Sequence, residues 1–231
     1  MLGGVPEPAR LFIESSTPRA SLALLRGSEV AFEASFTGDR SHNALLFDPL
    51  QRALALLEGG EKLEAVVIGT GPGSYSGTRV GIAAGQGVAL VHGCPAVGLS
   101  SLLAVPAAAG GKALAIGDAR RGSAWRVGIE GGGLLGEPEL CPAAALEAEV
   151  GAAMDSGVAV FSLESVVRLG LAPELAARIT VEHPEAQRLA AAWLSLSGVE
   201  VARLSALPPQ PVYLRPPHIT EAKGGHPLLR K

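Results

Sequence analysis

The chain opens with apolar runs of strand length. Leu11–Ile13 is a short apolar run that predicts a buried strand. The runs Ala20–Leu25 and Glu29–Phe36 follow, separated by Arg26-Gly27-Ser28, which is typical of a hairpin turn. We therefore expect three strands at the N-terminus, paired in an antiparallel manner.

The spacing of apolar residues then changes from the pattern of strands to the pattern of helices. Leucines recur at helical spacing from Ser41 to Leu57, and Ser41 is a suitable helix cap. The continuous apolar run Ala65–Gly69 predicts a strand that is covered on both faces. A glycine- and serine-rich loop leads from it into a helix expected over about 78–91, and Ala96–Gly98 reads as a further short strand.

A similar order of elements begins again after residue 112. Ala113–Gly117 predicts a strand ending at Asp118, and Ser123–Ile129 predicts the next, much as the first strand ends at Glu14 before a polar turn. This likeness hints at an internal duplication. We expect two α/β lobes joined near residues 106–111. The second lobe would continue with a hairpin-like stretch, a helix over about 142–154, a strand over 158–161 and a helix over about 184–196.

Composition excludes several classes of protein. The 231 residues are 48% hydrophobic but only 4% aromatic, so the core must be built from aliphatic side chains. Cys94 and Cys141 lie far apart, which indicates neither a disulfide framework nor a zinc cluster. No apolar run reaches the roughly 18 residues of a membrane span, so we expect no membrane association and a cytoplasmic location. The net charge of −3 argues against a protein that binds RNA by itself, although the last residues, from Arg215 onward, are basic.

The loop after the predicted strand Ala65–Gly69 is the most informative stretch: Gly69-Thr-Gly-Pro-Gly-Ser-Tyr-Ser-Gly-Thr-Arg-Val-Gly. A glycine-rich turn between a strand and a helix is where anions often bind. However, it lacks the Gly-Lys-Ser/Thr of a Walker A loop, the GxGxxG of a dinucleotide-binding loop and the GxSxG of a nucleophile elbow. The loop therefore specifies no known phosphate or hydrolase site.

Three glycines recur at every fourth position of the following helix: Gly77, Gly81 and Gly85. Residues four apart share one helical face, and each glycine costs about 1 kcal/mol of helix stability relative to alanine. Such a row indicates close approach of another backbone. We favour a helix crossing between molecules, while packing on the chain's own sheet is the alternative.

The same stretch resembles the signature GPGSFTGLRIG of the TsaB/YeaZ family. Further segments resemble that family in the same order: Ile13-Glu-Ser-Ser-Thr, Arg40-Ser-His with Leu45-Leu46, Pro95–Leu102, Asp118-Ala-Arg-Arg-Gly and Pro211-Val-Tyr-Leu-Arg. The resemblance spans most of the chain, while residues 134–207 add little to it. It implies a duplicated ribonuclease-H-like fold, as in the actin, sugar-kinase and Hsp70 superfamily, with a reduced second lobe. We place the lobes at residues 1–108 and 109–231.

The resemblance also implies a role. Members of the family act as a non-catalytic scaffold that activates and stabilises TsaD, the subunit that transfers threonylcarbamoyl to tRNA adenosine. A TsaE-type ATPase joins the assembly, and the scaffold forms homodimers when alone. The scaffold contacts tRNA only indirectly, through the complex. The expected interface uses the helices over 41–57 and 78–91, with Arg40, His42, Leu45, Leu46, Gly77, Arg79, Gly81 and Gly85 as candidate contacts.

The competing hypothesis is a weak ATPase or phosphotransferase with actin-like hairpins. Glu14 and Asp118 would be its acidic residues, but Glu14 stands where such enzymes have aspartate and Pro18 removes a backbone donor. No two of the five histidines are four residues apart, so we expect no metal site. We expect no cofactor and no catalytic residue, and the residues also offer no support for the peptidase label that some family members carry. An autonomous tRNA-binding protein is a third alternative, opposed by the acidic balance.

Overall fold

The computed structural model describes residues 7–38, 42–57 and 60–214. The first of its two sheets has five strands in the order β3-β2-β1-β4-β5. As expected, β1 to β3 are antiparallel, whereas β4 and β5 run parallel to β1. The strands are β1 Ala9–Glu14, β2 Arg19–Arg26, β3 Glu29–Thr37, β4 Leu63–Gly69 and β5 Ala96–Leu99.

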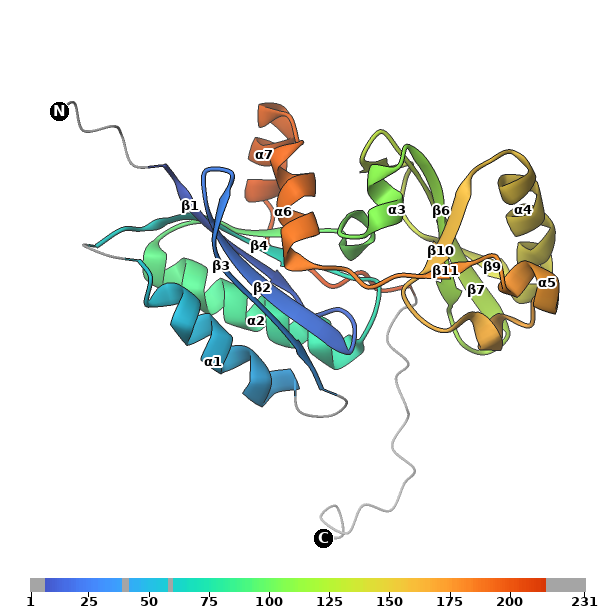
Figure 1. Cartoon of the computed structure of the whole chain (residues 1–231), viewed down its shortest axis with the longest axis horizontal. Helices are drawn as coiled ribbons and strands as arrows, with labels where there is room; N and C mark the ends of the chain where they lie inside the picture. The colour runs from blue at the N-terminus through green and yellow to red at the C-terminus, as the bar shows by residue number, and fades with distance from the viewer. Residues whose placement is uncertain (1–6, 39–41, 58–59, 215–231) are drawn as a thin grey trace, which may run out of the picture.

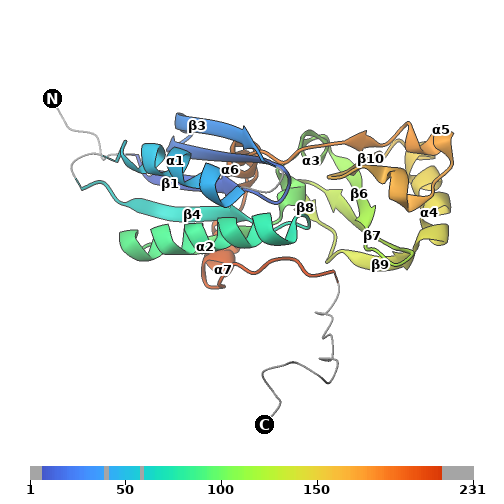
Figure 2. The same ribbon diagram turned by 90° about the horizontal axis from the view of Figure 1, so that it is seen from below.

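Helices cover both faces of this sheet. Alternate residues of β1 point to opposite faces, so Leu11 and Ile13 face one cluster of apolar side chains while Phe12 faces another. The first cluster is closed by α1 (His42–Leu54) and α2 (Tyr75–His92), and the second by α6 (Ala186–Leu194). Figures 1 and 2 show α1 and α2 side by side on one face, with α6 on the other.

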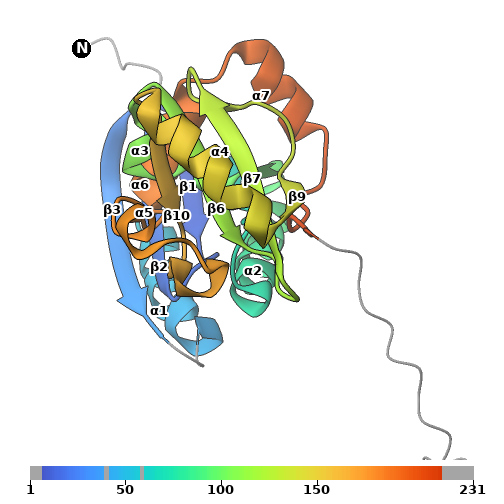
Figure 3. The ribbon, with the colours of Figure 1, turned by 90° about the vertical axis from the view of Figure 1, so that its right-hand side faces the viewer.

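The second sheet repeats the arrangement of the first. It has the order β11-β10-β6-β7-β8, with β9 also paired to β7. An antiparallel hairpin, β6 with β7, is again joined by strands parallel to its first strand. Helix α4 packs on one face and α3 on the other (Figure 3). The elements are α3 Pro106–Ala109, β6 Lys112–Asp118, β7 Ser123–Glu130, β8 Gly133–Leu134, β9 Glu139–Pro142, α4 Ala143–Asp155, β10 Ala159–Ser162 and β11 Thr180–Val181.

The second lobe is a reduced copy. Between the parallel strands β4 and β5 lies the 18-residue α2, whereas between β10 and β11 lie only the short 3-10 helix η2 (Val166–Leu169) and α5 (Pro173–Ala176). The expected duplication and the expected reduction are both present. None of the described helices is long and apolar enough to cross a membrane.

The chain returns to the first lobe after building the second. Leu189, Ala190 and Trp193 of α6 pack against the first sheet, and α7 (Gly198–Ser205) follows beside β5. The division at residue 108 stays a prediction, but helices that it assigns to the second lobe cover the first sheet. The sequence analysis also missed α7, although Ser197 and Glu200 form a reciprocal capping box at its start.

Candidate protein-interaction surface

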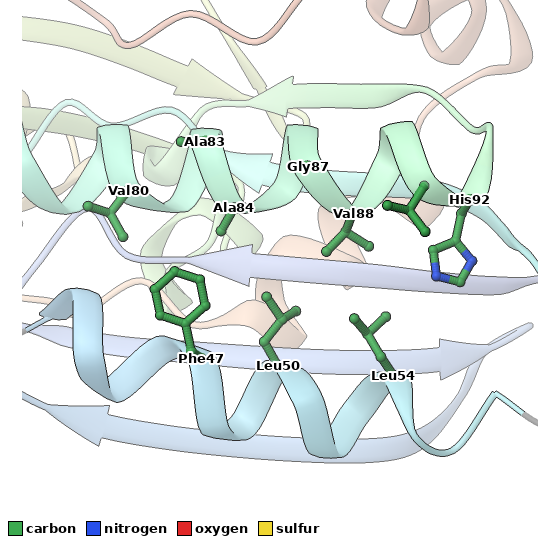
Figure 4. Close-up of a pocket in the computed structure, with 10 residues that line it drawn as sticks. Phe47, Leu50, Leu54, Val80, Ala83, Ala84, Gly87, Val88 and His92 are labelled. Carbon is green, nitrogen blue, oxygen red and sulfur yellow. The ribbon is translucent and has the colours of Figure 1, made fainter.

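An open apolar groove of about 530 Å³ runs between α1 and α2. Phe47, Leu50 and Leu54 point from α1 toward α2, as Figure 4 shows. Phe47 is 56% exposed and Val91 is 83% exposed, and large apolar side chains gathered in one exposed groove often mark an interaction site. The lining residues are Phe47, Leu50 and Leu54 from α1 with Val80, Ala83, Ala84, Gly87, Val88, Val91 and His92 from α2.

The groove exists because the two helices expose apolar faces over an already filled core. Leu46 and Ala53 of α1 face the sheet and are almost completely buried, so Phe47 and Leu54 project beside them toward α2. On α2, Ala83 and Gly87 are small residues four positions apart and face away from the sheet. The groove is therefore an outward surface of the folded chain and has no partner among the described residues.

The row of Gly77, Gly81 and Gly85 lies on the opposite, inward face of α2. All three glycines are buried. A Cβ atom at Gly77 or Gly81 would collide with Ser15, and one at Gly85 would lie 2.6 Å from Cγ1 of Ile68. The interpretation of this row as a crossing between molecules is therefore wrong. The glycines allow α2 to approach β1, β4 and the turn after β1.

The other predicted contact residues have mixed positions. Arg40 and the side chain of His42 lie outside the described residues. Leu45 is exposed on α1, whereas Leu46 is only 1% exposed and packs in the core, so Leu46 cannot contact a partner without unfolding. Arg79 is exposed at the start of α2 and contacts Tyr75 and Tyr213.

Sequence reasoning missed the groove residues as a set. The signal was present, because Ala83 and Gly87 form a second row of small residues two positions along from Gly81 and Gly85. Two rows of small residues on one helix fit a helix that packs closely on both sides. Phe47 was a further signal, as an aromatic residue in a chain with few of them.

The two acidic residues of the actin-like alternative do not share a pocket. A cleft between the lobes is lined by Ser16, Ser74, Asp118, Arg120 and Glu164, among others, but not by Glu14. The Glu14 side chain is fully buried, and it accepts a hydrogen bond from the amide of Ser16 at 2.7 Å.

The environments of these two acids shift their pKa values in opposite directions. Burial raises the pKa of Glu14 above its ordinary value, in spite of its hydrogen bonding to Ser16. Burial also acts on Asp118, but the hydrogen bonds and the charge of Arg120 outweigh it and lower the pKa of Asp118. The guanidinium of Arg120 lies 2.9 Å from Oδ2 of Asp118. Asp118 is thus a charged partner of Arg120, and Glu14 is a buried carboxyl.

The described residues hold no cluster of three histidine, cysteine, aspartate or glutamate side chains that could bind a metal ion. His92, at the end of α2, accepts a hydrogen bond from the amide of Leu63 through Nδ1 at 3.5 Å.

Comparison with known proteins shows which proteins this chain resembles. The family model of TsaD, tRNA N6-adenosine threonylcarbamoyltransferase, matches residues 37–134. The tRNA threonylcarbamoyladenosine biosynthesis protein TsaB of Haemophilus influenzae is 33% identical over 101 residues, which are 43% of this chain and 42% of that protein. The solved structure of YeaZ from Pseudomonas aeruginosa aligns with a TM-score of 0.63 and 22% identity, covering 90% of this chain and all of that one. The chain is a TsaB/YeaZ-like protein.

The TsaB/YeaZ likeness confirms the predicted fold class. A second structure from P. aeruginosa, described as similar to peptidase YeaZ, has the same TM-score of 0.63 at 24% identity. An uncharacterised protein of Mycobacterium tuberculosis is 30% identical over 118 residues, which are 48% of this chain and 54% of that protein. The chain thus spans about half the length of the curated relatives it matches.

Proposed function

We propose that this chain is a non-catalytic subunit of the assembly that forms threonylcarbamoyladenosine on tRNA, where it binds and stabilises a TsaD-type subunit. The exposed apolar groove between α1 and α2 is the observation that carries this proposal. Grooves of this kind accept helices, and burial of their apolar surface drives association. The partner would lay helices of its own against Phe47, Val80 and Val91.

The family comparison supports this choice of partner. The TsaD family model matches residues 37–134, a range that contains all of α1 and α2. A TsaD-type subunit would therefore carry related helices, so the two chains could pair about an approximate two-fold axis. A second copy of this chain could use the same groove. We infer that homodimer and heteromeric complex compete for it.

The geometry between the lobes supports a non-catalytic role. Asp118 is paired with Arg120, and Glu14 lies outside the cleft, so the two acids do not converge on one bound group. A TsaE-type ATPase would join through the assembled complex, and tRNA would be reached only through it. The proposal requires no cofactor in this chain.

The test is a binding titration with the TsaD-type subunit of the same organism. Gly87 faces the groove, and a Cβ built there meets no atom within 4 Å, so Gly87→Leu should fold and yet obstruct a partner. Gly151→Leu is the matched control, because Gly151 is also helical and also open but lies in α4 of the second lobe. We expect Gly87→Leu to weaken both the complex and the homodimer by about 100-fold or more, and Gly151→Leu to leave both unchanged. Wild-type affinity in Gly87→Leu would refute the proposed docking site.

A further inference from the structure

A compact aromatic and cationic cluster stands at the N-terminal end of α2. The guanidinium carbon of Arg79 lies 3.6 Å from the ring centroid of Tyr75 and 5.5 Å from that of Tyr213. Nε and Nη2 of Arg79 both donate to the hydroxyl of Tyr213, at 3.1 and 2.6 Å. All three side chains remain exposed, so the cluster is a surface feature. Its contacts place the Arg79 guanidinium against both rings.

The cluster is assembled by a segment from the other end of the chain. We call residues 207–214 the strap. Pro209 of the strap lies against Gly98 of β5, and the amide of Val212 donates to the carbonyl of Thr70 at 2.9 Å. Leu214, which is half-buried, then packs against the core of the second lobe. Because the strap is anchored on both sides of Tyr213, it holds the phenol hydroxyl where Arg79 can reach it.

The position of the cluster connects it to the groove. Arg79 immediately precedes Val80 and lies one helical turn before Ala83, and both of these residues line the groove. A subunit that fills the groove and extends along α2 would therefore reach Arg79. Arg79 has no carboxylate within ion-pair distance in the part of the chain that the structure describes.

The chemistry of the cluster fits a carboxylate. A planar guanidinium binds carboxylate oxygens in a defined geometry, and an arginine already fixed between two rings loses little freedom when it does so. Tyrosine and arginine are also, with tryptophan, the residue types enriched among those that dominate binding at protein interfaces. We propose that Tyr75, Arg79 and Tyr213 form the polar anchor of the docking surface and take an aspartate or glutamate side chain of the partner subunit. This inference rests on the proposed function and adds the strap to the interface.

The experiment is the same titration, repeated across a range of salt concentrations. Arg79→Ala removes the cation, and Tyr213→Phe removes only the hydroxyl that positions it. Arg52→Ala is the control: its guanidinium also lies over an aromatic ring, 5.3 Å from that of Phe32, and the substitution changes the net charge equally. We expect an affinity loss of about 10-fold or more for Arg79→Ala and a smaller loss for Tyr213→Phe. Arg52→Ala should behave like the parent protein. Removal of an ion pair with the partner should also make the affinity of Arg79→Ala less sensitive to salt.

The outcomes separate the anchor from the groove. If Gly87→Leu abolishes binding while Arg79→Ala and Tyr213→Phe bind as the parent does, the anchor is wrong and the docking site stands. If Gly87→Leu binds normally, the proposed function itself fails. If Arg79→Ala instead weakens binding of tRNA to the isolated chain and leaves the subunit affinity unchanged, the cluster serves nucleic acid and the anchor is overturned. Hydrogen exchange at the Val212 amide shows whether each variant keeps the strap in place.

Discussion

Substitution of Gly85 measures how tightly α2 packs against the first sheet. A Cβ atom at this position would lie 2.6 Å from Cγ1 and 2.7 Å from Cδ1 of Ile68, and 3.3 Å from Cγ1 of Val66. Ile68 and Val66 are completely buried in the inner strand β4, between β1 and β5. Neither side chain can move aside without disturbing the core, so any side chain at Gly85 must push α2 away from the sheet.

The magnitude follows from two opposing effects. Overpacking of a well-filled core costs about 1–3 kcal/mol, while replacement of a helical glycine by alanine returns about 1 kcal/mol. We therefore expect Gly85→Ala to lose about 0–2 kcal/mol of unfolding free energy. Gly85→Leu adds a branched side chain in the same place and should lose about 3 kcal/mol or more. At about 2–4 °C per kcal/mol, the leucine variant should melt about 6–12 °C or more below the parent.

The assay is thermal and urea unfolding followed by circular dichroism, with Gly87→Leu as the control in the same helix. Gly87 faces open space, so its substitution should leave the monomer as stable or up to about 1 kcal/mol more stable. Each protein should be measured over a range of concentrations, because loss of self-association lowers the Tm by itself. The opposite result would be a Gly85→Leu variant with the Tm of the parent and a Gly87→Leu variant with a lower Tm at every concentration. It would show that Gly87, and not Gly85, faces the sheet.

Two further predictions concern the acids. Burial raises the pKa of Glu14 in the folded chain, so the folded state keeps the carboxyl proton to a higher pH than the unfolded state does. The protonated carboxyl therefore contributes stability that is fully present below the unfolded pKa. This stability is lost as pH rises through the folded pKa. Glu14→Gln should therefore gain stability relative to the parent as pH rises through that window; parallel curves from urea unfolding between pH 4 and 8 would contradict this. For Asp118, we expect the isolated chain to show no ATP turnover and no threonylcarbamoyl transfer, measured at steady state. A clear rate that disappears in Asp118→Ala would instead favour the phosphotransferase hypothesis.

Local patterns were sufficient for most of the individual elements. The run Ala65–Gly69 lies within β4, which is covered on both faces as its continuous apolar character indicates. The hairpin signal at Arg26-Gly27-Ser28 does join β2 to β3, because turn chemistry acts over a few residues. These features depend on neighbours in the sequence, so the sequence predicts them well.

Relations between distant segments were harder to predict. The apolar face of α6 shows that the helix is buried on one side, but it does not say against which of two sheets. The contact between Arg79 and Tyr213 joins residues 134 positions apart. Nothing in the sequence around either residue indicates that it contacts the other. The glycine row shows the same difficulty, since small residues allow close approach of a strand as well as of a foreign helix. The two possibilities are distinguished only by knowing which face of α2 points toward the sheet and which points toward solvent.

The packing of α6 on the first sheet has a consequence for the order in which the protein can be made. Phe12, Val67 and Val97 belong to strands that leave the ribosome early, yet the helix that covers them ends at residue 194. During synthesis one side of the first sheet therefore stays uncovered until almost the whole chain has emerged, and nascent chains in this state expose apolar surface to which chaperones and other nascent chains can bind. A fragment cut at the junction of the two lobes would keep that bare side permanently. Separate expression of the N-terminal lobe thus calls for α6 to be supplied, either fused through a linker or added as a peptide.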